Sequence, residues 1–127
     1  MGQQQLLLIV LGVIIVGIAV VVGINVFTAS ASQANTDAVI ADLTNLAAMS
    51  QQHYRKPVAL GGGGNTFTGW IIPAQLDTTG NGTYTATVAP TIVTLIGNGT
   101  EKGTKSGTVK VTMVVGANAI TSTTINQ

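Results

Sequence analysis

The chain contains the stretch LLLIVLGVIIVGIAVVVGI, residues 6–24, in which all 19 residues are aliphatic or glycine. As an α-helix this stretch would be about 29 Å long, which matches the roughly 30 Å hydrocarbon thickness of a bilayer. A cleaved secretory signal needs a basic N-terminal region and a shorter apolar core, but residues 1–5 (MGQQQ) contain no base. The stretch therefore predicts a helix that spans a membrane.

The residues after this stretch continue the helix. Residues 25–35 contain neither proline nor glycine, and a second pattern follows in which apolar and small residues recur at helical spacing to form one stripe. The stripe consists of Val39, Ile40, Leu43, Leu46, Ala47, Ser50 and Tyr54. Arg55 and Lys56 favour a helix C-terminus, and Pro57 cannot continue the helix. We expect one helix from about Gln3 to Tyr54.

The opposite side of the helix from the stripe is small and weakly polar. It carries Asn45, Gln52, Ala41, Ala48 and Met49. One interpretation is an outer face in contact with solvent, and the other is a second packing surface against a neighbouring subunit. We favour the packing surface, because a monomer with so few charges has little to keep it soluble.

From residue 57 onward the chain has the composition of a β-sheet. Five segments are rich in β-branched residues and largely alternate: 66–72, 83–88, 91–96, 108–115 and 119–125. In 108–115 the apolar side chains occupy one face and threonines the other. The stripe on the helix is the available cover for the apolar face, which predicts an α+β fold with the helix packed on a small antiparallel sheet. The expected segments are 1–27 (apolar helix), 28–56 (amphipathic continuation) and 57–127 (β domain).

The composition excludes several classes of function. The 127 residues include five Lys or Arg, four Asp or Glu and no cysteine, which gives a net charge of +1. Because the largest basic cluster is Arg55-Lys56, the chain lacks the electrostatic footprint of a nucleic-acid-binding protein. Without cysteine it has no disulfide framework, thiolate nucleophile or iron–sulfur ligands.

Residues that carry catalytic chemistry are few and scattered. His53 is the only histidine, and its place near the helix end indicates a structural role. A pair of carboxylates for acid–base catalysis is not expected, because the acids are dispersed at Asp37, Asp42, Asp77 and Glu101. The loop at Asp77 lacks the spaced ligands of an EF-hand, and residues 61–64 (GGGG) lack the Gly-Lys-Ser/Thr of a phosphate loop and predict a flexible linker. We expect no enzymatic activity, metal or cofactor.

The tetrapeptide GNGT occurs twice, at residues 80–83 and 97–100. Asn-Gly next to a strand is a strong hairpin signal, because both residues accept positive φ angles. Each copy is also an Asn-x-Thr sequon, so Asn81 and Asn98 are candidate glycosylation sites. Turn chemistry alone explains both copies.

The chain resembles the type IV pilins and their pseudopilin and archaeal relatives. The resemblance rests on Gly2 followed by the polar Gln3, on the uninterrupted aliphatic helix of residues 6–24, and on the amphipathic continuation over a small sheet. It implies a prepilin peptidase that cuts after Gly2, so that Gln3 becomes the first residue. It also implies pilus assembly machinery that moves the apolar helices from the membrane into the core of a filament.

The N-terminal motif departs from the family pattern. Gln3 stands where the family usually has phenylalanine, as in archaeal processing sites, and Leu7 stands where it has a glutamate thought to set register. Met1 replaces the usual basic residue before the glycine, which leaves a leader of Met1 and Gly2. Register between subunits would then rest on the amides of residues 3–5 and on shape.

Two functions remain open at this stage. The first is a structural subunit of an extracellular, pilus-like helical homopolymer, inserted in the membrane before assembly and suited to adhesion or cell contact. The alternative is a single-pass, membrane-anchored pseudopilin or a tethered surface β domain that acts in secretion or uptake. The residues expected to pack in the filament core are Leu6, Leu7, Leu8, Leu11, Gly12, Ile15, Gly17, Ile18, Val22 and Gly23.

Overall fold

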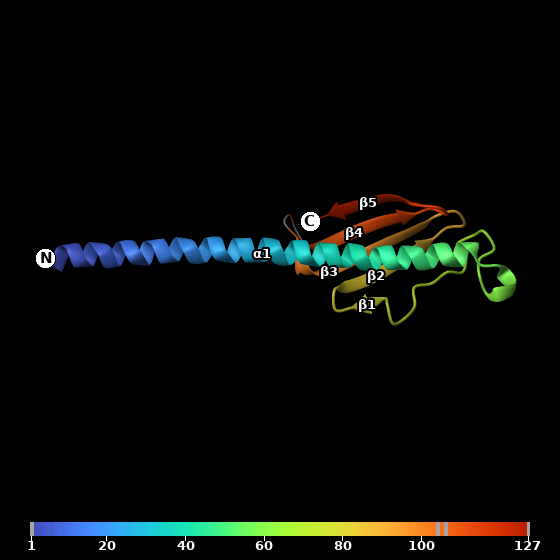
Figure 1. Cartoon of the computed structure of the whole chain (residues 1–127), viewed down its shortest axis with the longest axis horizontal. Helices are drawn as coiled ribbons and strands as arrows, with labels where there is room; N and C mark the ends of the chain where they lie inside the picture. The colour runs from blue at the N-terminus through green and yellow to red at the C-terminus, as the bar shows by residue number, and fades with distance from the viewer. Residues whose placement is uncertain (1, 104, 106, 127) are drawn as a thin grey trace. The chain divides into compact units, whose positions relative to one another are not determined.

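The computed structural model describes residues 2–103, 105 and 107–126. The chain divides into two compact units, Met1–Ala31 and Ser32–Gln127. The elements along the chain are labelled in Figure 1. They are the helix α1 (Gly2–Arg55), the short 3₁₀ helix η1 (Val58–Leu60), and the strands β1 (Thr78–Thr79), β2 (Gly82–Val88), β3 (Val93–Lys102), β4 (Thr108–Val115) and β5 (Ile120–Asn126).

Helix α1 confirms the single long helix predicted from the sequence, since it is continuous over 54 residues. It ends just before Pro57, as expected, but the glycines that follow are not the flexible linker that we predicted. Their backbone amides turn back onto the last carbonyls of the helix: Gly63 N lies 2.8 Å from His53 O, and Gly64 N lies 3.0 Å from Lys56 O. A Cβ on Gly62 would collide with the Lys56 carbonyl oxygen. The glycines therefore form an ordered cap that satisfies the helix C-terminus.

The strands form one antiparallel meander in the order β1-β2-β3-β4-β5. The predicted strands at 83–88, 91–96, 108–115 and 119–125 correspond to β2, β3, β4 and β5, with shifted ends except for β4. The prediction of a strand at 66–72 is wrong. There, Trp70 N donates to Phe67 O at 3.0 Å in a turn, so both aromatic side chains enter the core from a loop and do not alternate across a strand. The first strand of the sheet is instead the two-residue β1.

Within the second unit, α1 packs against one face of the sheet, as predicted (Figure 1). From the helix, Val39, Leu43, Leu46 and Ala47 are buried, while Ile40 and Tyr54 are half-buried against the same core. The remaining buried apolar residues come from the sheet and the preceding loop: Phe67, Trp70, Tyr84, Val93, Leu95, Val109, Val111, Met113 and Val115. The Tyr54 and Phe67 rings lie 4.8 Å apart between centroids, which closes the core at the C-terminal end of the helix.

The helix face opposite the core contains Ala41, Asn45, Ala48 and Gln52, all exposed. Met49 does not belong to this face, contrary to the sequence interpretation, because it is half-buried and packs against the core. Its position at the border of the buried stripe lets the long, flexible side chain turn inward.

Two glycines of β3 allow the helix to approach the sheet closely. Val93, Leu95, Gly97 and Gly99 alternate along the buried side of the strand. A Cβ on Gly97 would lie 2.6 Å from Cγ1 of Val39 and 3.0 Å from the Tyr84 ring. The second GNGT copy is therefore not a turn, as we predicted, but the interior of a strand whose glycines make room for the helix. The first copy does form a hairpin turn, since Thr79 pairs with Gly82 across the two intervening residues.

The other face of the sheet is rich in threonine. Thr83, Thr85 and Thr87 alternate with buried or half-buried residues along β2 and are exposed. On β4 the exposed residues Thr108 and Lys110 alternate with the buried valines in the same way. Threonine hydroxyls are the most frequent polar groups that this face exposes.

Replacing Gly97 by alanine should destabilise the second unit by about 1–3 kcal/mol, because the added methyl group overpacks a β-branched side chain that is rigid in a helix. Trp70, the only tryptophan, is 7% exposed, so its fluorescence reports unfolding of the full chain in detergent. The matched control is Gly80→Ala, since a Cβ there meets no described atom within 4 Å. Equal stability of the two variants would contradict the close approach at Gly97.

Candidate functional site

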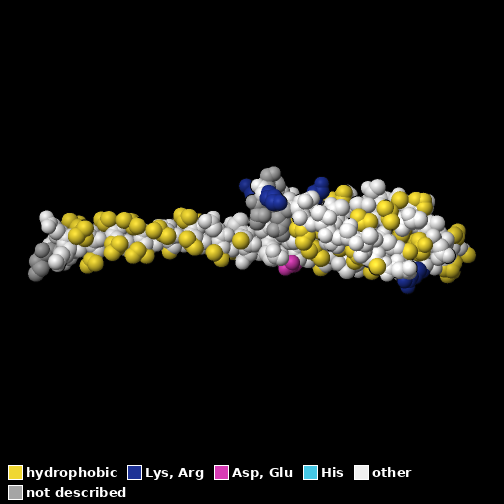
Figure 2. Space-filling model, turned by 90° about the horizontal axis from the view of Figure 1, so that it is seen from above, with side chains coloured by type: hydrophobic (Ala, Val, Ile, Leu, Met, Phe, Trp, Pro, Cys, Tyr) yellow, Lys and Arg dark blue, Asp and Glu magenta, His cyan; other side chains and the backbone are white. Residues whose placement is uncertain are grey.

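The first unit presents an apolar surface that nothing in the described chain covers. Every large apolar side chain between residues 6 and 27 is 53–75% exposed, and Figure 2 shows hydrophobic side chains along this part of α1. Monomeric proteins rarely expose contiguous apolar patches of more than a few hundred Å². Helix α1 is also long and apolar enough to cross a membrane. The surface therefore requires a partner, which is either lipid or protein.

All ten residues that the sequence assigned to filament-core packing lie on this surface and are exposed. A Cβ added to Gly12, Gly17 or Gly23 would meet no described atom within 4 Å, so these glycines do not serve packing within the chain. Gly12 and Gly23 are 11 residues apart, about three helical turns, and lie on one side, while Gly17 faces the other. The helix can thus be approached closely from two sides.

The candidate processing residues lie at the start of the helix. Gly2 and Gln3 are exposed in the first turn of α1. Met1, the other residue of the expected leader, lies outside the described residues. Cleavage after Gly2 stays a prediction.

In the second unit, the side chain of Asn35 ties the helix to both GNGT motifs. Its amide nitrogen donates to Asn81 O at 2.8 Å, and its Oδ1 accepts from the backbone N–H groups of Thr100 and Glu101 at 3.1 and 3.3 Å. Asn35 is only 8% exposed. The two motifs lie side by side because Gly82 pairs with Gly99, and Gly99 has no side chain to displace the Asn35 amide.

Two turns further along the helix, Asp42 accepts three hydrogen bonds on one oxygen. Its Oδ2 lies 2.5 Å from the Tyr84 hydroxyl, 3.1 Å from the Asn81 amide nitrogen and 3.2 Å from the Thr79 hydroxyl. Partial burial opposes the charge of Asp42, but the hydrogen bonds from Tyr84, Asn81 and Thr79 outweigh it, so the pKa of Asp42 is lowered. Burial and the bond to Asp42 raise the pKa of Tyr84 to about 12.

This arrangement fixes the helix in position. At neutral pH the carboxylate is ionised and the phenol is protonated, so the Tyr84 hydroxyl donates to Asp42 throughout the neutral range. We call Asn35, Asp42 and Tyr84, with their partners Asn81, Thr79 and Thr100, the polar clamp. It joins α1 to β1, β2 and β3.

The polar clamp was not predicted from the sequence. Asp42 was interpreted as one of four dispersed acids, and the buried stripe was expected to begin at Val39, whereas Ser32, Asn35 and Thr36 are also buried. A signal was present: Asn35, Val39, Asp42 and Leu46 follow each other at spacings of four, three and four residues. Polar residues at such positions lie among the apolar ones and face the same neighbours.

The two sequons have different surroundings. Asn81 is half-buried, and its amide nitrogen is bound to Asp42, so a glycan there would compete with the polar clamp. Asn98 is half-buried on the β3 face that carries no contact with α1, since it alternates with the buried Gly97 and Gly99. Glycosylation of either residue stays a prediction.

The other polar residues singled out in the sequence have local structural contacts. His53 Nε2 lies 3.2 Å from Thr68 O, and the Asp77 carbonyl accepts from Tyr84 N at 2.7 Å. Among the described residues, no group of three histidine or acidic side chains is placed to hold a metal ion.

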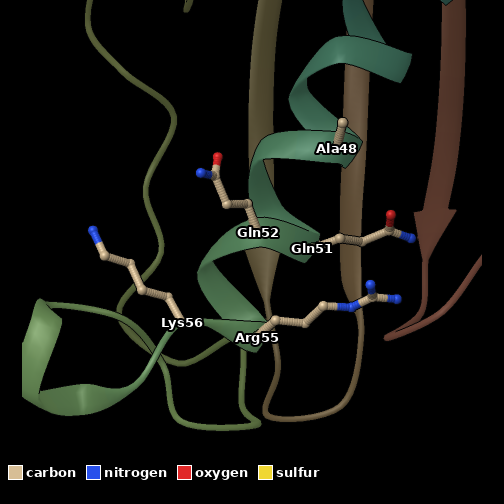
Figure 3. Close-up of a pocket in the computed structure, with 5 residues that line it drawn as sticks. All are labelled: Ala48, Gln51, Gln52, Arg55 and Lys56. Carbon is tan, nitrogen blue, oxygen red and sulfur yellow. The ribbon is translucent and has the colours of Figure 1, made fainter.

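A shallow depression of about 570 Å³ lies at the C-terminal end of α1 (Figure 3). Ala48, Gln51, Gln52, Arg55 and Lys56 line it. The Gln51 amide donates to Gly116 O at 3.1 Å, which links the helix to the segment after β4. Two of the five lining side chains are cations.

The fold and the exposed helix define an α+β protein with a pilin-like arrangement, in which a long apolar N-terminal helix packs its later part on a small antiparallel sheet. Comparison with protein-family models, with curated proteins and with solved structures finds no match to the chain.

The hydrogen bond between Tyr84 and Asp42 predicts a loss of stability in alkali. Below pH 10 the phenol is protonated in both states; between pH 10 and about 12 the unfolded chain releases the proton that the folded chain retains, so unfolding is favoured as the pH rises. Tyr84→Phe should lower stability at neutral pH and flatten the decline above pH 10, measured by denaturant unfolding with Trp70 fluorescence. Tyr54→Phe, which leaves the Asp42–Tyr84 bond in place, is the control and should retain the full alkaline decline.

Proposed function

We propose that this protein is the structural subunit of an extracellular, pilus-like helical filament. The observation that supports this most strongly is the helix surface of residues 6–27, on which every large apolar side chain is more than half exposed. Such a surface is stable in lipid, and outside lipid it is stable only when other apolar surfaces cover it. A membrane-inserted pool of subunits that assembles by helix packing meets both conditions.

The surface favours contacts with neighbours in two directions over a two-fold dimer. Gly12 and Gly23 on one side and Gly17 on the other permit close contact with neighbours in two directions, and close approach at small residues is how helices associate within lipid. Contacts between different patches of identical subunits generate rings or filaments, according to whether the rotation closes. A bundle of many apolar helices with the β units outside buries the whole surface.

The threonine-rich sheet face suits the outside of such a filament. Hydroxyl groups keep it wettable with few charges, which fits adhesion or contact with other cells. By resemblance to the type IV pilins, a prepilin peptidase would act between Gly2 and Gln3, and assembly machinery would extract the helix from the membrane. The role is structural and non-catalytic, with no cofactor.

A second candidate is a single-pass, membrane-anchored pseudopilin or tethered β domain in secretion or uptake. It is favoured by the length and apolarity of α1, which alone satisfy the needs of an anchor. The two functions differ in whether the glycines of the helix matter. An anchor needs only apolar length, whereas a packed core needs small residues where neighbours approach.

Replacing Gly12, Gly17 and Gly23 together by leucine separates the two functions. The isolated chain has room for these side chains, and leucine raises both apolarity and helix propensity, so membrane insertion should be retained. We expect the fraction of the protein that sediments as fibres, and the fibres seen by electron microscopy, to fall at least tenfold. The control is the triple variant Val10→Leu, Val16→Leu, Val21→Leu, which enlarges side chains without filling a glycine site.

If the glycine variant forms as many fibres as the wild type, close packing at the glycines does not contribute to assembly. Two results together would favour the anchor. The wild-type chain would stay monomeric after membrane extraction, and native cells shown by mass spectrometry to contain the protein would carry no fibres.

A further inference from the structure

The exposed side of α1 in the second unit carries one acid and one base in line. Asp37 and Arg55 are both exposed and lie 18 residues apart, which is about five helical turns, so they face the same direction about 27 Å apart. The exposed residues between them on this side are uncharged, and small ones predominate: Ala41, Thr44, Ala48 and Gln52. We call this line from Asp37 to Arg55 the outer stripe.

Within the part of the chain that the structure describes, the contacts made by the two charged ends of the outer stripe do not neutralise them. Asp37 accepts a hydrogen bond from the Gln33 amide at 3.0 Å, and Arg55 makes a long contact of 3.5 Å to the Asn118 amide oxygen. Both partners are uncharged. At the Arg55 end the surface is hollowed, because the depression of Figure 3 is lined by Arg55 and Lys56 together with Ala48 and two glutamines.

We propose that opposite ends of the outer stripe meet between copies: a second copy is displaced by about 27 Å along the helix axis, so that Asp37 of one copy enters the depression at Arg55 and Lys56 of the next. This proposal rests on the proposed filament and names one of its contacts. The charges identify the occupant: the acidic end of the outer stripe on one copy complements the basic end of the outer stripe on another.

The geometry of this contact propagates. After two copies pair, the first still offers an unused basic end and the second an unused acidic end, so a third copy adds in the same way. A contact between different patches that leaves both ends free is the heterologous, non-closing type that generates filaments. The contact also differs in kind from packing of the apolar helix surface, since it joins the charged residues Asp37, Arg55 and Lys56.

Cross-linking tests the juxtaposition directly, because the chain has no cysteine of its own. We compare three variants of the whole chain: Asp37→Cys, Arg55→Cys and the double variant. Fibres of each are treated with a short bismaleimide, whose spacer is about as long as the two side chains of an Arg–Asp pair in contact. We expect the double variant to give a ladder of three or more linked copies on denaturing gels and each single variant to stay monomeric. The two positions are too far apart on one helix to be linked within a copy.

Charge reversal tests the energetics. Asp37→Arg and Arg55→Asp should each reduce the sedimenting fraction at least about fivefold, since like charges then meet, and the double reversal should restore it. The controls Asp77→Arg and Lys110→Asp make the same changes of net charge at exposed positions off the outer stripe and should leave sedimentation unchanged. Trp70 fluorescence verifies that every variant is folded.

Wild-type fibres that form while the double cysteine variant gives no ladder, or while both charge reversals sediment normally, would overturn the outer-stripe contact and leave the filament standing. Absence of wild-type fibres would overturn the filament and this contact with it.

Discussion

The second unit depends on how closely α1 can approach β3. Gly97 and Gly99 occupy buried positions that would elsewhere carry branched side chains, and the space they leave is filled by Val39 and by the amide of Asn35. Further along the helix, the apolar residues of the stripe, among them Leu43 and Leu46, pack on the same face of the sheet. Without the two glycines the helix would be held away from β3 near Asn35 and Val39, and Asn35 and Asp42 would not reach their hydrogen-bond partners on the strands.

Apolar packing and the polar clamp have different roles in this contact. Burial of Leu43, Leu46 and their neighbours supplies a large but non-directional driving force, which tolerates sliding and rotation of the helix. Hydrogen bonds from Asn35 and Asp42 are directional, and buried groups left without them are costly. The clamp therefore selects one register of the helix among those that the apolar core would accept.

Much of the fold was predictable because it follows from periodicity. The helix of 54 residues, four of the strands and the stripe from Val39 to Tyr54 were visible as patterns of apolar and β-branched residues. The segment around Phe67 and Trp70 was misread because its threonines, isoleucines and aromatics have high strand propensity, whereas the turn between Phe67 and Trp70 brings both aromatic side chains into one core. The second GNGT copy was misread because Asn-Gly signals a turn locally, while the need for space under Val39 exists only in the folded state.

The candidate site was predictable to a different extent. An uncharged helix surface is evident in the sequence, so its residues could be named in advance. For the polar clamp, helical spacing places Asn35 and Asp42 beside the buried stripe, but their partners could not be named, because they lie about 40 to 65 residues away along the chain and converge only when β2 pairs with β3.

The threonine face of the sheet has a consequence for the environments that the protein tolerates. Dissolved salt screens the interactions between exposed charged groups. At physiological ionic strength, charges separated by more than the Debye length of about 8 Å interact only weakly. Hydroxyl groups such as those of Thr83, Thr85 and Thr87 bind water through hydrogen bonds that need no net charge. A coat built from this face would stay hydrated alike in fresh water and in brine, and across changes of pH that would alter an acidic or basic surface.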